Sequence, residues 1–424
     1  MARSGRGRRL AQLVKLRLVA QLNNYGPIRV AFRALRQFAP VLVVGRTAVV
    51  SRHADCVDVF RRDEDFTISE LNAPVMDRVN GPFVLGMDRG PQYDRENGIL
   101  ERCVHPGDLD RIRELVRTTA GELIDAARAH GRIDVVNGLA RVTAARVISS
   151  YFGIPGPDEA TLMRWMRSIF YETFMNVTRD PGVQKAGEAS GAEFHAYVHQ
   201  LIAERRAQIA DGDGAAPDDF FTRLVRLAGE PETHLSDEGI IRNIGGVVVG
   251  ALDTTSKATT HAVFELLRRP EIVAGARQAA RAGGGEALTP FVLEALRFNP
   301  LNPALARKAA RETAIAQGTR REQRVPAGCL VYLAIGAAMF DADAFPEPDR
   351  FRTDRPQEAY LHFGHGMHTC FGEHVNLVQM PEVAAALVQL DDLRLAPGAD
   401  GRIVYDGPFP DRLLVDFAPR EELR

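Results

Sequence analysis

Cysteine is scarce in this chain. Its 424 residues include four cysteines, Cys56, Cys103, Cys329 and Cys370, which are spread over the whole sequence. Proteins that are held together by disulfides have many cysteines in a short chain, so that class is excluded. The same scarcity indicates a reducing compartment, and we expect the protein to be cytoplasmic.

An excess of charge of one sign and long hydrophobic runs are also missing. The 53 basic and 55 acidic residues give a net charge of −2, which offers no overall field for nucleic acid. The most apolar stretches, Val41–Val50 and Val325–Phe340, contain Gly, Arg or Pro and fall short of the ~20 residues of a membrane-spanning helix. The sequence therefore predicts no nucleic-acid partner and no integral membrane association.

The first 22 residues differ from the rest. Four arginines between positions 3 and 9 precede the stretch Leu10–Leu22, which contains Lys15 and Arg17. A signal peptide would have an unbroken apolar run and a small-residue cleavage site. We therefore expect residues 1–22 to be a basic segment leading into a helix, with a membrane-surface or partner-docking helix as the alternative. The remaining residues, 23–424, are expected to form one domain.

Helical periodicity dominates that domain. Between Ser236, a suitable N-cap, and Pro270, the segment Gly239–Arg269 predicts one helix of about 45 Å. Further helices are expected over Ile112–Ala129, Arg132–Tyr151, Glu188–Ile209, Asp219–Leu227 and Val375–Leu390. Strands are few: a hairpin of Val41–Val44 with Ala48–Val50, and a strand–turn element over Val325–Leu333. The pattern predicts a mainly helical domain with small β-sheets.

One cysteine stands in an unusual setting. Cys370 lies in a Gly-punctuated loop, with Phe363 seven residues before it and Gly372 two residues after, and an apolar helical run follows. A cysteine just before a helix N-terminus has a stabilised thiolate. The histidines nearby also allow a zinc site, but one loop alone supplies the ligands, whereas zinc needs three or four that converge.

The stretch 363–372 resembles the haem-binding loop of cytochromes P450, and three other P450 motifs occur in the expected order. The loop matches at Phe363, Gly364, Gly366, His368, Cys370 and Gly372. Glu294-Ala295-Leu296-Arg297 resembles the Glu-x-x-Arg helix, and the segment Phe345–Phe351 contains an arginine, Arg350, expected to join that pair. The run Gly250–Thr255 resembles the oxygen-activation motif. The resemblance implies the P450 fold, a single triangular-prism-like domain with a long central helix.

The resemblance also implies roles for individual residues. Cys370 would be the axial ligand of the iron of haem b, and a thiolate there favours O–O cleavage. His368 and Arg307 would contact the haem propionates, Ala251 would lie beside the haem, and the glycines of the loop would let the backbone approach it. Asp253 would relay protons and Thr254 would position oxygen and a water.

The sequence departs from the family in several places, one of which is the inverted order of Gly250 and Ala251. Where P450s usually have His-x-x-x-Arg, Tyr93 and Asn97 stand, which leaves Arg95 as the candidate cation for a propionate. The common Ala-Arg pair after the cysteine is replaced by Asn376-Leu377. Pro381 is expected to interrupt the following helix, because proline kinks a helix interior.

The activity implied is that of a haem-thiolate monooxygenase that inserts one oxygen atom from O₂ into a mostly apolar small molecule. Electrons would come from NAD(P)H through a reductase and a separate ferredoxin-type partner, docking near Arg102, Arg111 or Arg113. By family position the substrate pocket would be lined by Phe83, Val84, Leu85, Phe170, Phe174, Val247, Gly250, Leu301, Leu305 and Phe409. Peroxide-driven or isomerase-like use of the haem, and a non-catalytic haem-binding protein, are the alternatives.

Overall fold

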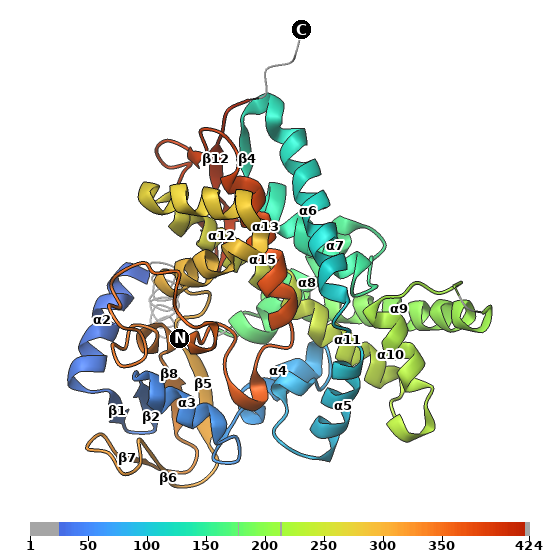
Figure 1. Ribbon diagram of the computed structural model, residues 1–424. Coiled ribbons are helices and arrows are strands. Elements are labelled where there is room, and N and C mark those ends of the chain that lie inside the picture. The colour runs from blue at the N-terminus through green and yellow to red at the C-terminus, as the bar shows by residue number, and fades with distance from the viewer. Residues whose placement is uncertain (1–24, 177, 213, 420–424) are drawn as a thin grey trace, which may run out of the picture.

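The computed structural model describes residues 25–176, 178–212 and 214–419, which form a triangular, mainly helical body with small sheets at its margins (Figure 1). The mainly helical class expected from the sequence is confirmed. The expected basic segment 1–22 lies outside the described residues. Within the described part, no helix is both long enough and apolar enough to cross a membrane.

Fourteen helices are described, three of which build the centre of the body. Their bounds are α2 (Tyr25–Phe38), α3 (His53–Arg61), α4 (Ser69–Val79), α5 (Pro91–Arg102), α6 (Asp108–Ala127), α7 (Arg141–Ser150), α8 (Glu159–Phe170), α9 (Pro181–Ala210), α10 (Phe220–Ala228), α11 (Asp237–Ala251), α12 (Asp253–Leu267), α13 (Pro270–Phe298), α14 (Ile335–Ala338) and α15 (Glu373–Val388). In the centre, α13 lies against both α12 and α15.

Four small sheets complete the fold. The largest has the order β1-β2-β8-β5-β3, and its strands are β1 (Val41–Val44), β2 (Thr47–Val50), β8 (Leu330–Leu333), β5 (Leu305–Ala309) and β3 (Phe66–Thr67). The others are β4-β12-β9 (Arg132–Asp134, Leu414–Asp416 and Arg394–Leu395), β10-β11 (Val404–Asp406 and Phe409–Arg412) and β6-β7 (Thr313–Ile315 and Gln323–Val325). The predicted hairpin is confirmed, since β1 and β2 pair antiparallel. Strand β2 then pairs in parallel with β8.

The long helix expected over Gly239–Arg269 is interrupted. The hydroxyl of Ser236 accepts a hydrogen bond from the Gly239 N–H, as expected of an N-cap. The helix breaks at Leu252, whose ψ of −76° departs from the helical value, and α11 ends there while α12 begins. The break falls inside the Gly250–Thr255 motif, so the sequence motif marks a local change of backbone path.

Small residues in α11 allow side chains to pack directly on its backbone. A Cβ on Gly246 would lie 2.2 Å from the Phe83 ring, and one on Gly245 would lie 2.2 Å from the Asn80 amide oxygen. Glycine costs helix stability, up to about 1 kcal/mol relative to alanine. Here the cost is offset by close contact with the segment that precedes α5.

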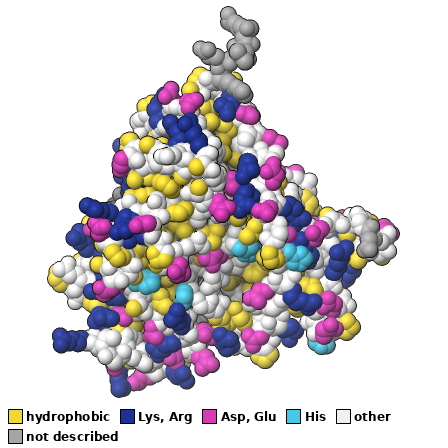
Figure 2. Space-filling view, in the orientation of Figure 1, with side chains coloured by type: hydrophobic (Ala, Val, Ile, Leu, Met, Phe, Trp, Pro, Cys, Tyr) yellow, Lys and Arg dark blue, Asp and Glu magenta, His cyan; other side chains and the backbone are white. Residues whose placement is uncertain are grey.

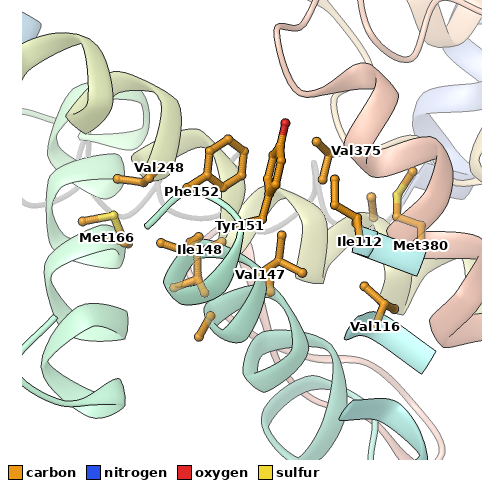
Figure 3. Packing of buried hydrophobic residues seen from close by; sticks show 14 of the residues in the cluster. Ile112, Val116, Val147, Ile148, Tyr151, Phe152, Met166, Val248, Val375 and Met380 are labelled. Atoms are coloured by element: carbon orange, nitrogen blue, oxygen red, sulfur yellow. The ribbon is translucent and has the colours of Figure 1, made fainter. Parts of the chain in front are cut away.

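The main core lies where α6, α7, α11 and α15 meet. Figure 3 shows Tyr151 and Phe152 between Val248 of α11 and Val375 of α15, and the four are buried. Ile112 approaches from α6, which closes the cluster on its other side (Figure 3). These contacts fix α15 against α11, so they also fix the loop that enters α15.

Two local expectations are wrong. The range Arg132–Tyr151 is a short strand, a π-helical turn (Val136–Ala140) and α7 rather than one helix, because its first residues pair with β12. Pro381 does not interrupt α15, which continues through it to Val388. Pro381 and its neighbours are buried, and packing of this kind outweighs the local penalty of proline.

Buried charges connect α13 to the segment that leads to Cys370. The guanidinium of Arg297 donates to both carboxylate oxygens of Glu294, at 2.6 and 2.8 Å, and both residues are fully buried. The third partner is Arg355, whose Nε lies 3.3 Å from Glu294 Oε1. Burial raises the pKa of Glu294, but the hydrogen bond and charge of Arg297, together with hydrogen bonds from the Arg352 N–H and the Tyr360 hydroxyl, outweigh burial, and the pKa is lowered. The expectation that the Arg350 side chain joins this pair is wrong, because that side chain is exposed and pairs with Glu347. Arg350 contributes only its carbonyl, which accepts a hydrogen bond from Arg297 at 3.1 Å.

This arrangement predicts different outcomes for two arginines five positions apart. Arg355→Ala removes a buried cation from Glu294 and should lower the free energy of unfolding by about 3–5 kcal/mol. Arg350→Ala removes an exposed pair and should cost less than about 1 kcal/mol. Urea unfolding followed by circular dichroism measures both. Equal losses in the two variants would contradict the placement of Arg355.

Candidate active site

The loop before α15 is held in shape by its own backbone and by two glycines. The Cys370 N–H donates to the Phe363 carbonyl at 2.8 Å, and the Cys370 carbonyl accepts from the Glu373 N–H at 3.1 Å. Gly364 and Gly366 have positive φ angles, and a Cβ on Gly366 would lie 2.7 Å from the Phe60 carbonyl oxygen of α3. The glycines are therefore required by the turn and by its close contact with α3.

Cys370 precedes the first turn of α15, with Gly372 as its N-cap residue. Burial raises the pKa of the Cys370 thiol to about 11, against a backbone hydrogen bond from Gly372 that favours the thiolate. A metal cation deprotonates a coordinating thiol outright. The site is thus suited to a thiolate that is stabilised by a bound metal rather than by neighbouring side chains.

The cysteine and the broken helix face the same cavity. Cys370 and Gly372 line it on one side, and Gly250, Ala251 and Thr255 line it on the other. The expected proximity of Cys370, Ala251 and Gly250 is therefore present in the structure. At the break, the hydroxyl of Thr254 donates to the carbonyl of Gly250.

Asn376, which the sequence marks only as a departure from the family, connects the two sides. Its amide nitrogen donates to the Gly372 carbonyl at 3.0 Å, and its amide oxygen accepts from the Thr255 hydroxyl at 2.8 Å. It therefore ties α12 to the cysteine loop. No sequence signal assigned this role, because the contact joins residues 121 positions apart.

Asp253 is buried between two arginines that the sequence analysis missed. Its Oδ1 lies 2.9 Å from Arg167 Nη2 of α8 and 3.3 Å from Arg141 Nε of α7. Burial lowers the pKa of Arg141, and Asp253 opposes that shift. Arg167 also lies 3.8 Å from Asp406, whose side chain is exposed. The carboxylate is thus linked through Arg167 to the surface.

Arg307 and His368 supply donors that the protein itself leaves unused. Arg307 of β5 is buried over the Phe60 ring, donates to the Ala306 carbonyl, and makes no ion pair within the described residues. The Nδ1 atom of His368 is buried and has no described hydrogen-bond partner. Burial lowers the pKa of Arg307 to about 10, and burial together with Arg307 lowers that of His368 to about 4. A buried cation beside an unpartnered imidazole nitrogen fits a carboxylate-bearing group.

Of the α5 residues that differ from the family pattern, one contacts the cysteine loop and the others point away from it. The hydroxyl of Tyr93 donates to the Met367 carbonyl at 2.8 Å, and its ring meets the edge of His368. Asn97 donates to Glu101. Arg95 is two residues from Tyr93, about 200° around the helix, and its side chain is 40% exposed beside Glu96. The expectation that Arg95 faces the cofactor is therefore wrong.

The expected pocket residues divide into three groups. Phe83, Leu85, Val247 and Gly250 line the cavity that contains Cys370. A separate aromatic cluster is formed by Phe170, Phe174 and Phe409, with ring centroids 4.8 and 5.5 Å apart. Val84, Leu301 and Leu305 are not among the residues that line the cavity, and Leu305 pairs with Leu333 within the sheet.

The zinc alternative finds no support in the described residues, where no group of three or more His, Cys, Asp or Glu side chains could hold a metal. His362 contacts the Leu293 carbonyl, and Arg61 donates to His365. These histidines therefore face different neighbours and do not converge.

Comparison with known proteins gives a consistent result. The family model described as Cytochrome P450 matches residues 44–410. The chain is 25% identical to "Vitamin D(3) 25-hydroxylase" of Pseudonocardia autotrophica, over 92% of this chain and 94% of that protein. It is 29% identical to "Mycinamicin IV hydroxylase/epoxidase" of Micromonospora griseorubida, over 74% and 73%. Among solved structures, CalO2 superposes with a TM-score of 0.80 at 24% identity, over 93% of this chain and 98% of that one.

The thiol at a helix start, the broken helix across the cavity, and the N–H donors of Arg307 and His368 that could bind a carboxylate agree with what this match implies, including haem as the cofactor. The chain belongs to the cytochrome P450 family of monooxygenases.

Proposed function

We propose that this protein is an O₂-dependent monooxygenase that hydroxylates or epoxidises a mostly apolar small molecule, with electrons from a separate redox partner. The observation that carries the proposal is the broken helix. Asp253 and Thr254 lie next to each other at the break, and their neighbours Gly250, Ala251 and Thr255 line the cavity that contains Cys370. A protein that only binds haem has no need of a buried acid and a hydroxyl at that point.

The residues that would hold haem are Cys370, Arg307 and His368. Cys370 would ligate the iron as a thiolate, and Arg307 with His368 would donate to the propionates, while Tyr93 braces the loop through the Met367 carbonyl. When bound, haem supplies the iron chemistry by which O₂ is activated, and the thiolate favours O–O cleavage.

The chain's own contribution to turnover is the delivery of protons. Inserting one oxygen atom and releasing the other as water consumes two electrons and two protons. Thr254 donates to the Gly250 carbonyl, and its oxygen can still accept a hydrogen bond from a water. Asp253 is held by Arg167, which in turn lies near the exposed Asp406. Rotation of Asp253 away from Arg167 would carry a proton from this surface toward Thr254.

The walls of the cavity support an apolar substrate. Phe83, Leu85, Val147, Phe152 and Val247 contribute apolar side chains to it. An aromatic and aliphatic lining excludes water and binds substrates by burial of apolar surface. By their titles, the two named relatives act on vitamin D(3) and on mycinamicin IV. The lining of the cavity is the observation that supports a mostly apolar substrate for this chain.

The arginines proposed for redox-partner docking are not isolated cations. Arg102 pairs with Glu230 at 2.9 Å, Arg111 lies 3.4 Å from Asp108, and Arg113 pairs with Asp110. A docking partner with acidic residues would compete with these internal acids. The proposal of a ferredoxin-type partner at this surface therefore predicts binding that weakens as salt increases.

The ligand assignment predicts a spectroscopic result. The reduced CO complex of the purified protein should have the strongly red-shifted Soret band of a thiolate ligand. Cys370→Ser should lose that band, while Cys329→Ser, which alters a buried cysteine away from the cavity, should keep it. Persistence of the band in Cys370→Ser would contradict the assignment.

The propionate assignment predicts a difference in haem retention. Charge-assisted hydrogen bonds contribute roughly 1.5–3 kcal/mol, so Arg307→Gln should speed haem loss roughly tenfold to a hundredfold. Arg95→Gln should leave it unchanged, because Arg95 faces away from the loop. Haem transfer to apomyoglobin measures both rates. Equal rates in the two variants would count against Arg307.

The proton-delivery assignment predicts uncoupling. Thr254→Ala should keep the CO band and consume NADH with surrogate redox proteins, yet release hydrogen peroxide instead of oxygenated product. Thr254→Ser retains the hydroxyl and should restore coupling to product. The proposal would be contradicted if the wild type turned over as fast with peroxide as with O₂ and if Thr254→Ala left the peroxide rate unchanged. That result would favour a peroxygenase.

A further inference from the structure

A second cavity lies apart from the one that contains Cys370. Its described lining comes from α2, the ends of α12 and α13, and residues 395–405, and its volume of about 830 Å³ is in the range of small-molecule sites. It shares no described lining residue with the cavity of Cys370. Thr255 lines one cavity and Glu265 lines the other, and the length of α12 between them places them about 15 Å apart. A molecule in this second cavity, which we call the α12 cleft, therefore lies away from the thiol.

Aromatic side chains form one wall of the α12 cleft. Phe264 of α12, Phe298 of α13 and Tyr405 of β10 line it, and we call them the aromatic wall. The Tyr405 hydroxyl lies 3.0 Å from Nε2 of His261, whose Nδ1 lies 3.2 Å from the Asn299 carbonyl. The carbonyl can only accept, so Nδ1 carries the proton and Nε2 accepts from Tyr405. Because its hydroxyl is used in this way, Tyr405 offers the cleft an aromatic ring.

Arginines lie beside the aromatic wall. Arg268 and Arg269, at the junction of α12 and α13, share the carboxylate of Glu265, with Nη1 atoms 3.2 Å from Oε1 and 2.5 Å from Oε2. Glu265 is the one acidic residue among the described residues that line the cleft. Arg402 lines it as well, is exposed, and its side chain has no hydrogen bond or ion pair within the described part of the chain.

The charge of the α12 cleft is therefore unbalanced. A fourth arginine, Arg29, is paired from outside by Asp349 at 2.8 Å, but the other three have Glu265 alone. Over the face that Figure 2 shows, dark-blue and magenta side chains are interspersed instead. Each guanidinium has five N–H donors, and the bonds to Glu265 use few of them. An anion in the cleft would supply the missing charge and accept the remaining donors.

The arginines and the aromatic wall are in contact with each other. The guanidinium carbon of Arg268 lies 5.2 Å from the centre of the Phe264 ring, and that of Arg269 lies 4.7 Å from the centre of the Phe298 ring. Guanidinium planes stack with aromatic rings as well as binding anions. The same small volume therefore offers planar stacking surfaces and N–H donors to one ligand.

We propose that the α12 cleft binds a small aromatic carboxylate. Its ring would stack against the aromatic wall and the guanidinium planes, with water excluded from both. Its carboxylate would accept from Arg402 and from the remaining donors of Arg268 and Arg269, since guanidinium forks match carboxylates in geometry. A bare inorganic anion would leave the aromatic wall uncovered, and a neutral aromatic molecule would leave the guanidinium groups unpaired.

The test is isothermal titration calorimetry of the holoprotein with 2-naphthoate, in the presence of saturating 4-phenylimidazole. The imidazole occupies the iron site, so binding of 2-naphthoate that leaves the Soret band unchanged occurs elsewhere. The neutral 2-naphthamide has the same rings and should bind about tenfold more weakly or worse. Arg402→Gln and Arg268→Gln should each weaken binding of 2-naphthoate about tenfold, because each removes a charge-assisted hydrogen bond.

Matched controls separate the α12 cleft from general effects of charge. Arg226→Gln removes an exposed arginine from α10, which Figure 1 shows well apart from α12, and should bind 2-naphthoate like the wild type. Arg402→Lys keeps the charge but loses the planar fork, so its affinity should lie between those of the wild type and Arg402→Gln. The thermal midpoint of every variant verifies that it is folded.

Three results would overturn the proposal. One is the absence of 2-naphthoate binding once 4-phenylimidazole occupies the iron site. Another is binding of 2-naphthamide or of inorganic phosphate as tight as that of 2-naphthoate, which would remove either the charge or the aromatic ring from the recognition. The third is equal affinity of Arg402→Gln, Arg268→Gln and Arg226→Gln for 2-naphthoate, which would place the bound molecule outside the α12 cleft.

Discussion

The architecture around the cavity depends on one buried carboxylate. Glu294 accepts hydrogen bonds from Arg297, from the Arg352 N–H at 3.0 Å and from the Tyr360 hydroxyl at 2.9 Å, and Arg355 lies beside it. A buried charge is tolerated only when it is paired and fully hydrogen-bonded. Because its partners come from α13 and from residues 352–360, satisfying Glu294 fixes the chain that leads into the cysteine loop. His362 extends this connection by contacting the Leu293 carbonyl and stacking on Tyr360.

The parts of the site that could be predicted from sequence are those whose residues are close together in the chain. Cys370, its glycines and the Glu294–Arg297 pair lie within short motifs, where spacing alone decides which residues are neighbours. Helix caps and the β1–β2 hairpin are local for the same reason. Arg350 and Arg355 are both a few residues from the motif, and only the path of the chain determines which one reaches Glu294.

What could not be predicted depends on tertiary contacts. Arg141 and Arg167 contact Asp253 from positions 112 and 86 residues earlier in the chain, and arginines are too common for either to stand out in the sequence. Arg95 is the candidate cation that the sequence offers beside Tyr93, whereas in the structure Tyr93 contacts the cysteine loop, and the buried donors of Arg307 and His368 lie on other elements. Pro381 and Leu252 are further cases in which the local sequence pattern gives the wrong helix boundaries. Packing keeps α15 continuous through Pro381, and the cavity-lining segment breaks at Leu252, although its periodicity predicts one continuous helix.

The parallel pairing of β2 with β8 has a consequence for the order of folding. Thr47 of β2 pairs with Leu330 of β8, so β8 cannot cover the free edge of β2 until most of the chain has been synthesised. Closing so long a loop is entropically slow, and folding rates fall as contacts become more distant in sequence. During that interval β2 is an uncovered strand edge carrying valines, which is the kind of segment that aggregates or recruits chaperones. Production of this protein should therefore be more sensitive to the rate of translation than to the stability of the finished fold.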